Sequence, residues 1–137
     1  MHKKFVILLA VIFFIGFVSA CCVQQKAINI IDAKTAKGMD DKLMPKDVTS
    51  VFVHDTTMVY CWFKWNSAED GAKITAKWFY VTDNIHIMDY TFSVLRKEGT
   101  GGVSLVMPAG KTLPAGLYRV ELTSEGKVLR SLDFKIQ

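Results

Sequence analysis

The sequence predicts an all-β fold, an antiparallel β-sandwich of about seven strands that follows a separate N-terminal segment. Short runs of β-branched and aromatic residues recur along most of the chain, which is typical of strands. Clusters of Asn, Asp and Gly, which tolerate turn conformations, separate these runs. In the last third of the chain, apolar and polar residues alternate with period two, as in strands with one buried face. These patterns predict one domain over residues 28–137, where no segment has a helical period of useful length.

Residues 1–20 have the three parts of a secretory signal peptide. Lys3 and Lys4 form a short basic start. A charge-free apolar run, Phe5–Val18, follows, and Ser19-Ala20 closes the segment with small residues. The lysines favour the cytoplasmic side of the membrane, while the apolar run partitions into the bilayer. The segment is therefore expected to target the chain and to take no part in the folded domain.

The motif Val18-Ser19-Ala20-Cys21 resembles the lipobox of bacterial lipoprotein precursors, which is an aliphatic residue, two small residues and a cysteine. Position 18 is Val, where that family most often has Leu. The resemblance implies that the thiol of Cys21 carries diacylglycerol and that cleavage makes Cys21 the new N-terminus. Several acyl chains buried together hold a protein firmly on a membrane. The resemblance thus implies a palmitate-bearing lipoprotein, anchored at the extracytoplasmic face of the cell membrane.

The lipobox also implies a short tether, because residues 21–27 are then the lipidated cysteine and a linker. The six residues 22–27 span at most about 20 Å when fully extended, so the domain stays close to the membrane. Position 22 is Cys rather than the Asp that can retain lipoproteins at the inner membrane of two-membrane bacteria. In such an organism the resemblance favours the outer membrane.

Two other fates of the N-terminal segment stay open. The stretch Phe5–Val23 has no charge and is about as long as the roughly 20 apolar residues of a membrane span, so it could serve as an uncleaved anchor. Alternatively, an ordinary signal peptide is cut after Ala20 and leaves a soluble secreted protein. The cysteine placed directly after the small pair favours the lipid anchor over both.

The charge balance gives no sign of a nucleic-acid partner. The chain has 17 basic and 13 acidic residues and a net charge of +4, which falls to +2 once Lys3 and Lys4 leave with the signal. No dense Lys/Arg cluster, the electrostatic footprint of nucleic-acid binding, occurs in the chain.

Three strands are expected before residue 72, one of them strongly marked. Val59 to Trp65 is β-branched and aromatic, which suits a pleated surface, and residues 66–71 favour a loop. The weaker elements before them are a first strand at 27–36, a polar loop at 37–47 and an edge strand at 48–54.

Later strands are expected at 72–81, 85–95, 103–107, 117–123 and 128–136. Residues 96–102, polar and rich in glycine, predict a flexible connection. Residues 124–127 predict a tight hairpin turn. Tyr118, Val120 and Leu122 share one face of their strand, so this face is expected to be buried.

The segment Leu113-Pro114-Ala115-Gly116-Leu117-Tyr118-Arg119-Val120 resembles the start of the penultimate strand in immunoglobulin-like and fibronectin-III-like domains. The resemblance implies that Tyr118 bonds back across the corner before this strand, and that Trp78 is the tryptophan of the third strand. Cys61 lies where such domains often have the first disulfide cysteine, but no cysteine follows it. This fold hosts many functions, so the resemblance implies no particular one.

Two cysteines remain if Cys21 is lipidated. An oxidising compartment permits a disulfide between Cys22 and Cys61. The position of Cys61 inside an apolar strand instead favours a buried small hydrophobic residue.

No residues predict catalysis, a metal site or a cofactor. The mature chain has two histidines, His54 and His86, with Asp55, Asp83 and Asp89 nearby in sequence. In a regular strand His86 and Asp89 lie on opposite faces, so they are not expected to share a ligand. The motifs of serine hydrolases and zinc proteases, and a phosphate-binding glycine loop before a helix, are lacking. The sequence therefore predicts a non-enzymatic protein.

The most distinctive candidates for binding are Tyr60, Trp62 and Phe79, because they occupy strand faces that should be polar. If the two strands are neighbours, the three side chains form an exposed apolar patch, and such patches often mark contact sites. Alternatively, the polar segment before Val48 or the first strand covers this face, or a bulge exchanges the two faces.

These observations predict a membrane-anchored envelope lipoprotein that is a non-enzymatic protein-binding or structural module, with an envelope protein as its partner. The alternative is a carbohydrate-binding module in which Tyr60, Trp62 and Phe79 stack on sugar rings.

Overall fold

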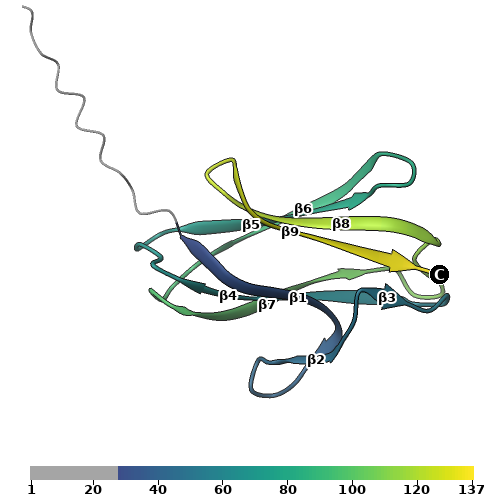
Figure 1. Ribbon diagram of the computed structural model, residues 1–137, viewed down its shortest axis with the longest axis horizontal. Helices are drawn as coiled ribbons and strands as arrows, with labels where there is room; N and C mark the ends of the chain where they lie inside the picture. The colour runs from purple at the N-terminus through teal and green to yellow at the C-terminus, as the bar shows by residue number, and fades with distance from the viewer. Residues whose placement is uncertain (1–27) are drawn as a thin grey trace, which may run out of the picture.

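The computed structural model describes residues 28–137, and within them the chain forms nine strands and no helix (Figure 1). The strands are β1 (Asn29–Met39), β2 (Pro45–Val48), β3 (Val51–Phe52), β4 (Met58–Asn66), β5 (Lys73–Tyr80), β6 (Ile85–Ser93), β7 (Gly99–Val106), β8 (Gly116–Ser124) and β9 (Lys127–Ile136). The segment predicted to be a signal peptide, Cys21 and Cys22 lie outside the described residues.

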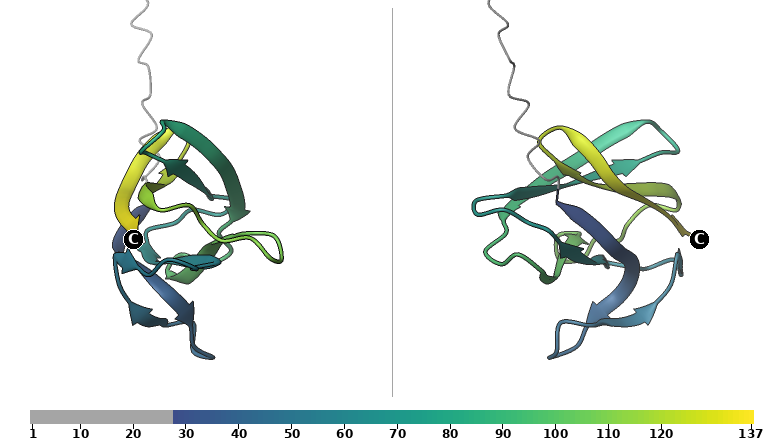
Figure 2. Two further views of the ribbon diagram at one scale, coloured as in Figure 1. Left: turned by 90° about the vertical axis from the view of Figure 1, so that its right-hand side faces the viewer. Right: turned by 60° about the vertical axis from the view of Figure 1, so that its left-hand side comes forward.

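The strands form two stacked sheets, as Figures 1 and 2 show. One sheet has four strands in the order β2-β1-β4-β7, and the other has five in the order β3-β9-β8-β5-β6. All neighbours are antiparallel except β3 and β9, which pair in parallel through Val51 and Phe52. The predicted all-β sandwich is confirmed. The nine strands exceed the predicted count of about seven, and β3 lies within the edge strand expected at 48–54.

Two segments expected to be loops are partly strands. The expected loop at 37–47 contains the end of β1 and most of β2, which pair through Gly38↔Lys46 and Met39↔Pro45. The expected flexible connection at 96–102 contains the start of β7. Glycine is needed here because aromatic rings of β4 lie close to the β7 backbone. A Cβ on Gly99 would lie 3.0 Å from the ring of Trp65, and a Cβ on Gly101 would lie 3.3 Å from the ring of Phe63. Glycine in a strand marks such close approaches as well as flexibility.

The core lies between the sheets and follows the predicted alternation. Its members come from alternate positions of each strand; among them are Val59, Cys61, Phe63, Trp65, Ile74, Trp78, Tyr118, Val120, Leu122, Phe134 and Ile136. Trp78 of β5 is completely buried and meets Phe134 edge-on, with ring centroids 6.0 Å apart. Its indole N–H has no hydrogen-bond acceptor, so Trp78 contributes through the packing of its ring.

Tyr118 closes the corner before β8, as the resemblance implied. Its hydroxyl donates to the carbonyl of Pro114 at 2.6 Å, and its ring stacks on Phe134 at 5.1 Å. Burial, with a smaller contribution from Tyr80, raises the pKa of Tyr118 to about 12. The hydroxyl therefore stays protonated, and remains a donor, throughout the physiological range.

Cys61 is a buried free thiol of β4. Burial raises its pKa to about 12, because the low-dielectric core disfavours the thiolate. The expectation of a small buried hydrophobic residue is confirmed. A thiol that stays protonated is a poor nucleophile, so Cys61 is suited to packing.

Candidate functional site

Trp62 of β4, expected in an exposed patch, is covered. Only 3% of it is exposed, because the β1–β2 hairpin bends out of the four-stranded sheet and lies below it in Figure 1. The indole N–H of Trp62 donates to the carbonyl of Leu43, in the hairpin turn, at 2.8 Å. The ammonium group of Lys34 lies 6.0 Å from the ring centroid. The segment before Val48 thus covers this face, which was the alternative considered from the sequence.

The turn over Trp62 is held in a fixed shape. A carboxylate oxygen of Asp40 accepts from the backbone N–H groups of Lys42 at 2.8 Å and Met44 at 3.0 Å. Leu43 has φ of 59°, a left-handed conformation that costs a non-glycine residue roughly 1–2 kcal/mol. The bond from Trp62 to the Leu43 carbonyl helps to hold this strained turn against the sheet.

Tyr60, Trp62 and Phe79 do not form one patch, which corrects the expectation. Tyr60 and Trp62 belong to β4 in the four-stranded sheet, whereas Phe79 belongs to β5 in the five-stranded sheet. Tyr60 is half-buried on the outer face of its sheet, between Ala36 of β1 and Ser104 of β7. Consecutive strands often pair as a hairpin, but here β4 and β5 cross from one sheet to the other, as in many β-sandwiches.

Phe79 lies on the outer face of the five-stranded sheet, at the centre of a row of side chains. Its neighbours across the strands are His86 on β6 and Arg119 on β8, and the ring centroids of Phe79 and His86 are 5.2 Å apart. Arg119 pairs with Asp133 of β9 at 2.7 Å, and the hydrogen bond to Asp133 raises the pKa of Arg119. This row joins an aromatic ring to charged groups on an exposed surface.

Beside this row the surface has a shallow hollow of about 230 Å³. It is lined by Phe79, Tyr80, Val81, Asn84, Ile85, Arg119 and Glu121. The turn between β5 and β6 forms one wall, and Asn84 holds that turn with φ of 52°. The lining combines apolar side chains with one cation, Arg119, and one anion, Glu121.

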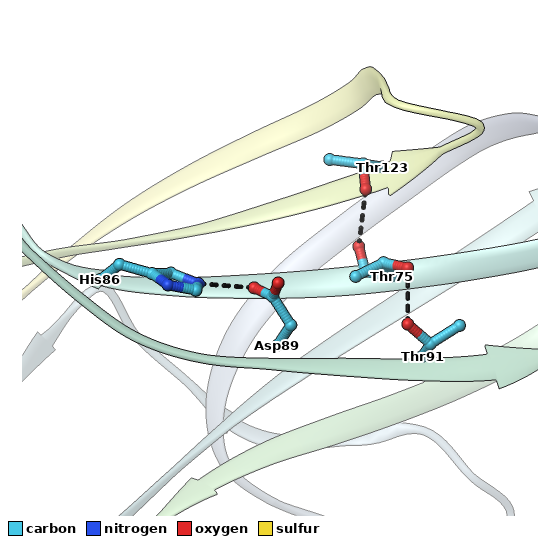
Figure 3. Close-up of polar contacts among 5 residues, drawn as sticks. All are labelled: Thr75, His86, Asp89, Thr91 and Thr123. Atoms are coloured by element: carbon cyan, nitrogen blue, oxygen red, sulfur yellow. Dashed lines mark hydrogen bonds and ion pairs between the residues drawn. The ribbon is translucent and has the colours of Figure 1, made fainter.

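His86 and Asp89 lie on the same face of β6, which corrects the sequence expectation. Trp78 pairs with Met88 while Phe79 pairs with His86, so Ile87 is an extra residue, a β-bulge. The bulge brings His86 Nε2 within 2.6 Å of a carboxylate oxygen of Asp89 (Figure 3). His54, in the connection between β3 and β4, forms its own exposed pair with Asp55 at 3.4 Å.

Strand β6 is the most unusual surface element. It is an edge strand, paired only with β5 among residues 28–137, and nearly all of it is exposed. Four of its exposed residues are large and apolar: Ile85, Ile87, Met88 and Tyr90. Only Phe92, near the end of the strand, reaches the core, where it stacks on Phe63 at 5.4 Å.

Side-chain hydrogen bonds link β5 to both of its neighbours, β6 and β8. The hydroxyls of Thr75 and Thr91 are 2.8 Å apart, and Thr123 of β8 donates to the carbonyl of Thr75 at 3.3 Å (Figure 3). The Thr75–Thr91 bond ties β6 to β5, and no side chain of β6 is fully buried. The outer edge of β6 is left with backbone N–H and C=O groups that have no strand partner, a template for an added strand.

Within residues 28–137, no group of three or more His, Cys, Asp or Glu side chains is placed to hold a metal ion. The same part of the chain contains no helix long and apolar enough to cross a bilayer.

Comparison with known proteins identifies the fold. No protein-family model and no curated protein matches the sequence. An immunoglobulin-like protein from Pseudomonas aeruginosa is similar in structure, with a TM-score of 0.55, 10% identity, and coverage of 82% of this chain and 98% of that one. The fold is immunoglobulin-like. This agrees with the Tyr118 corner and the buried Trp78 of the same sheet.

A DNA-bound alkylpurine DNA glycosylase, AlkC from Pseudomonas fluorescens, has a TM-score of 0.56 and 12% identity. The match covers 80% of this chain but only 30% of the glycosylase. Identities this low show a shared fold alone, and an immunoglobulin-like fold carries many functions.

The exposed edge at β6 was not predicted from the sequence, although its residues carried a signal for it. Ile85 and Ile87 occupy alternate positions of the strand. Met88 and Tyr90 occupy the positions in between, which in a regular strand face the opposite side. Apolar residues on both faces of a strand are also typical of a strand that is buried on both sides. Only the sheet order, which places β6 at an edge, distinguishes an exposed strand from a buried one.

Proposed function

We propose that this protein is a lipid-anchored envelope lipoprotein whose immunoglobulin-like domain is a non-enzymatic binding module for an extended segment of an envelope protein. The observation that carries the proposal is the β6 edge. It combines unpaired backbone groups with four exposed large apolar side chains, and these are the two components of recognition by strand addition.

The side chains around β6 support a peptide partner over a sugar. An added strand takes its affinity from main-chain hydrogen bonds and its specificity from pockets for alternate side chains. The hollow beside Phe79 lies at the start of β6, with Ile85 in its lining, and supplies one such pocket. A sugar platform would need Trp62, the largest of the three candidate aromatics, and that ring is covered by the β1–β2 hairpin.

Site-specific photo-crosslinking in living cells tests the binding surface. A photoreactive residue replaces Tyr90 on β6, and the matched control replaces the exposed Ser131 on β9. We expect a discrete crosslinked protein from position 90 and none from position 131, because only the first lies on a strand with an unpaired outer edge and exposed apolar neighbours. Equal yields from the two positions, or no product from position 90 in a folded protein, would count against the β6 site.

The lipid anchor has an independent test, which uses an alkyne-tagged palmitate fed to bacterial cells that express the full chain. Wild type and Cys22→Ala should be labelled, while labelling of Cys21→Ala should fall to background, because the lipobox places the acylated thiol at position 21. The mature wild-type mass should correspond to a chain that begins at Cys21. Labelling that survives in Cys21→Ala would contradict the anchor assignment.

A further inference from the structure

The domain has a defined end at which the chain enters from the N-terminal segment. The start of β1 lies at the left of Figure 1, together with the β4–β5 and β6–β7 connections, and the C-terminus lies at the opposite end. Trp65 connects these parts. Its backbone pairs with Ile30 of β1, and its indole N–H donates to the carbonyl of Arg96 in the β6–β7 connection at 3.1 Å.

This end carries Leu95, which is 90% exposed. No other large apolar side chain among residues 28–137 is as exposed. The residue before it, Val94, is buried in the core, so the chain turns outward between the two. Arg96 and Lys97 follow, and both are exposed.

The backbone around Leu95 is held on both sides. The N–H of Val94 donates to the carbonyl of Ala72 at 2.8 Å, and the N–H of Ala68 donates to the carbonyl of Lys97 at 2.9 Å. With the bond from Trp65 to Arg96, three hydrogen bonds fix a connection of only a few residues. Leu95 therefore lies on a connection whose backbone is held on both sides by hydrogen bonds, with its side chain 90% exposed.

We propose that the corner Leu95-Arg96-Lys97 docks on the lipid bilayer and orients the domain on the membrane. The inference rests on the lipid anchor of the proposed function. The short segment between Cys21 and the domain favours the bilayer as the surface that this corner contacts. If Cys21 is lipidated, residues 22–27 reach at most about 20 Å, so the end of the domain that begins at Ile28 must face the bilayer, and Leu95 lies at that end.

The chemistry of the corner fits a lipid interface. The Leu95 side chain can enter the boundary between headgroups and acyl chains, as apolar residues of interfacial segments do. Arg96 and Lys97 can extend their charged ends to the headgroups while their methylene stems follow the apolar surface. Glu98, Glu69 and Asp70 lie nearby in the two connections, so the corner carries both signs of charge. The apolar side chain is therefore the main contact.

The test measures the depth of a nitroxide on the lipidated protein in vesicles of phosphatidylethanolamine and phosphatidylglycerol. The label is placed by Leu95→Cys in a Cys22→Ala background, where Cys61 is buried and unreactive. The matched control is Ala109→Cys, in the exposed connection between β7 and β8 at the opposite end. At position 95 we expect collisions with oxygen, which concentrates in the bilayer, to exceed those with a water-soluble nickel chelate severalfold. At position 109 the order should reverse.

The outcomes separate this inference from the anchor itself. If the protein floats with the vesicles but the label at position 95 stays as accessible to nickel as that at position 109, the docking corner is overturned and the anchor stands. If the protein does not float with the vesicles, both are overturned. Neither labelled position is buried, so both variants should fold.

Discussion

Replacing Trp78 with alanine should lower the free energy of unfolding by about 3–5 kcal/mol, the usual range for removing a large aromatic side chain from a core. Trp78 is completely buried between the two sheets, with its edge contact to Phe134. The surrounding strands are fixed by their ladders, so they cannot collapse into the space that is left. Because a marginally stable domain has only about 5–15 kcal/mol in total, this single change should bring the protein close to unfolding.

The matched variant Trp78→Phe separates the contribution of ring packing to stability from that of the indole N–H. The indole N–H has no acceptor, so Phe loses volume but no hydrogen bond and should cost less than half as much as Ala. Urea denaturation followed by circular dichroism measures both. A cost for Phe as large as that for Ala would show that the N–H bonds to a group in the core, such as a buried water, and that packing is not the main contribution.

Replacing Trp62 with alanine should cost about 3 kcal/mol and loosen one part of the molecule selectively. The change removes the surface on which the β1–β2 hairpin rests and the hydrogen bond that holds the strained turn at Leu43. Hydrogen exchange should accelerate at the amides of residues 39–48, while amides of β8 and β9 keep their protection, because those strands lie in the other sheet.

The variant Trp62→Phe keeps a six-membered ring but removes the donor to Leu43 and part of the ring volume. It should cost about 1 kcal/mol for the lost hydrogen bond together with the cost of the lost volume, and less in total than Trp62→Ala. Exchange that accelerates equally in all strands would mean that the hairpin is part of the global folding unit, and would contradict the selective effect. Together, Trp62→Ala and Trp62→Phe separate the contributions of packing and hydrogen bonding to stability. Trp62 is the residue whose position on the outer face first indicated a binding role.

A feature of this structure can be predicted from the sequence when it depends on residues close together in the chain. Alternation along a strand is local, so the buried face of β8, with Tyr118, Val120 and Leu122, could be predicted from its own residues. The resemblance around Leu113–Val120 also led to the hydrogen bond between Tyr118 and Pro114. Both follow from chemistry within a few residues.

The features that were predicted wrongly from the sequence depend on residues far away in the chain. The glycines of β7 indicated a flexible loop, yet they lie against Trp65 and Phe63, more than thirty positions earlier in the chain. The bulge at Ile87 brings His86 and Asp89 together, and nothing in the strand itself specifies that extra residue. The separation of Tyr60 from Phe79 follows from sheet order, which pattern analysis of single strands does not contain.

The parallel pairing of β3 with β9 has a consequence for the time course of folding. Val51 pairs with Lys135 and Phe52 with Ile136, so β3 cannot pair until β9, more than eighty positions later in the sequence, has been made. Pairings this distant in sequence make all-β domains slow to fold, typically over milliseconds to seconds. The sandwich can therefore close only after β9 has been made.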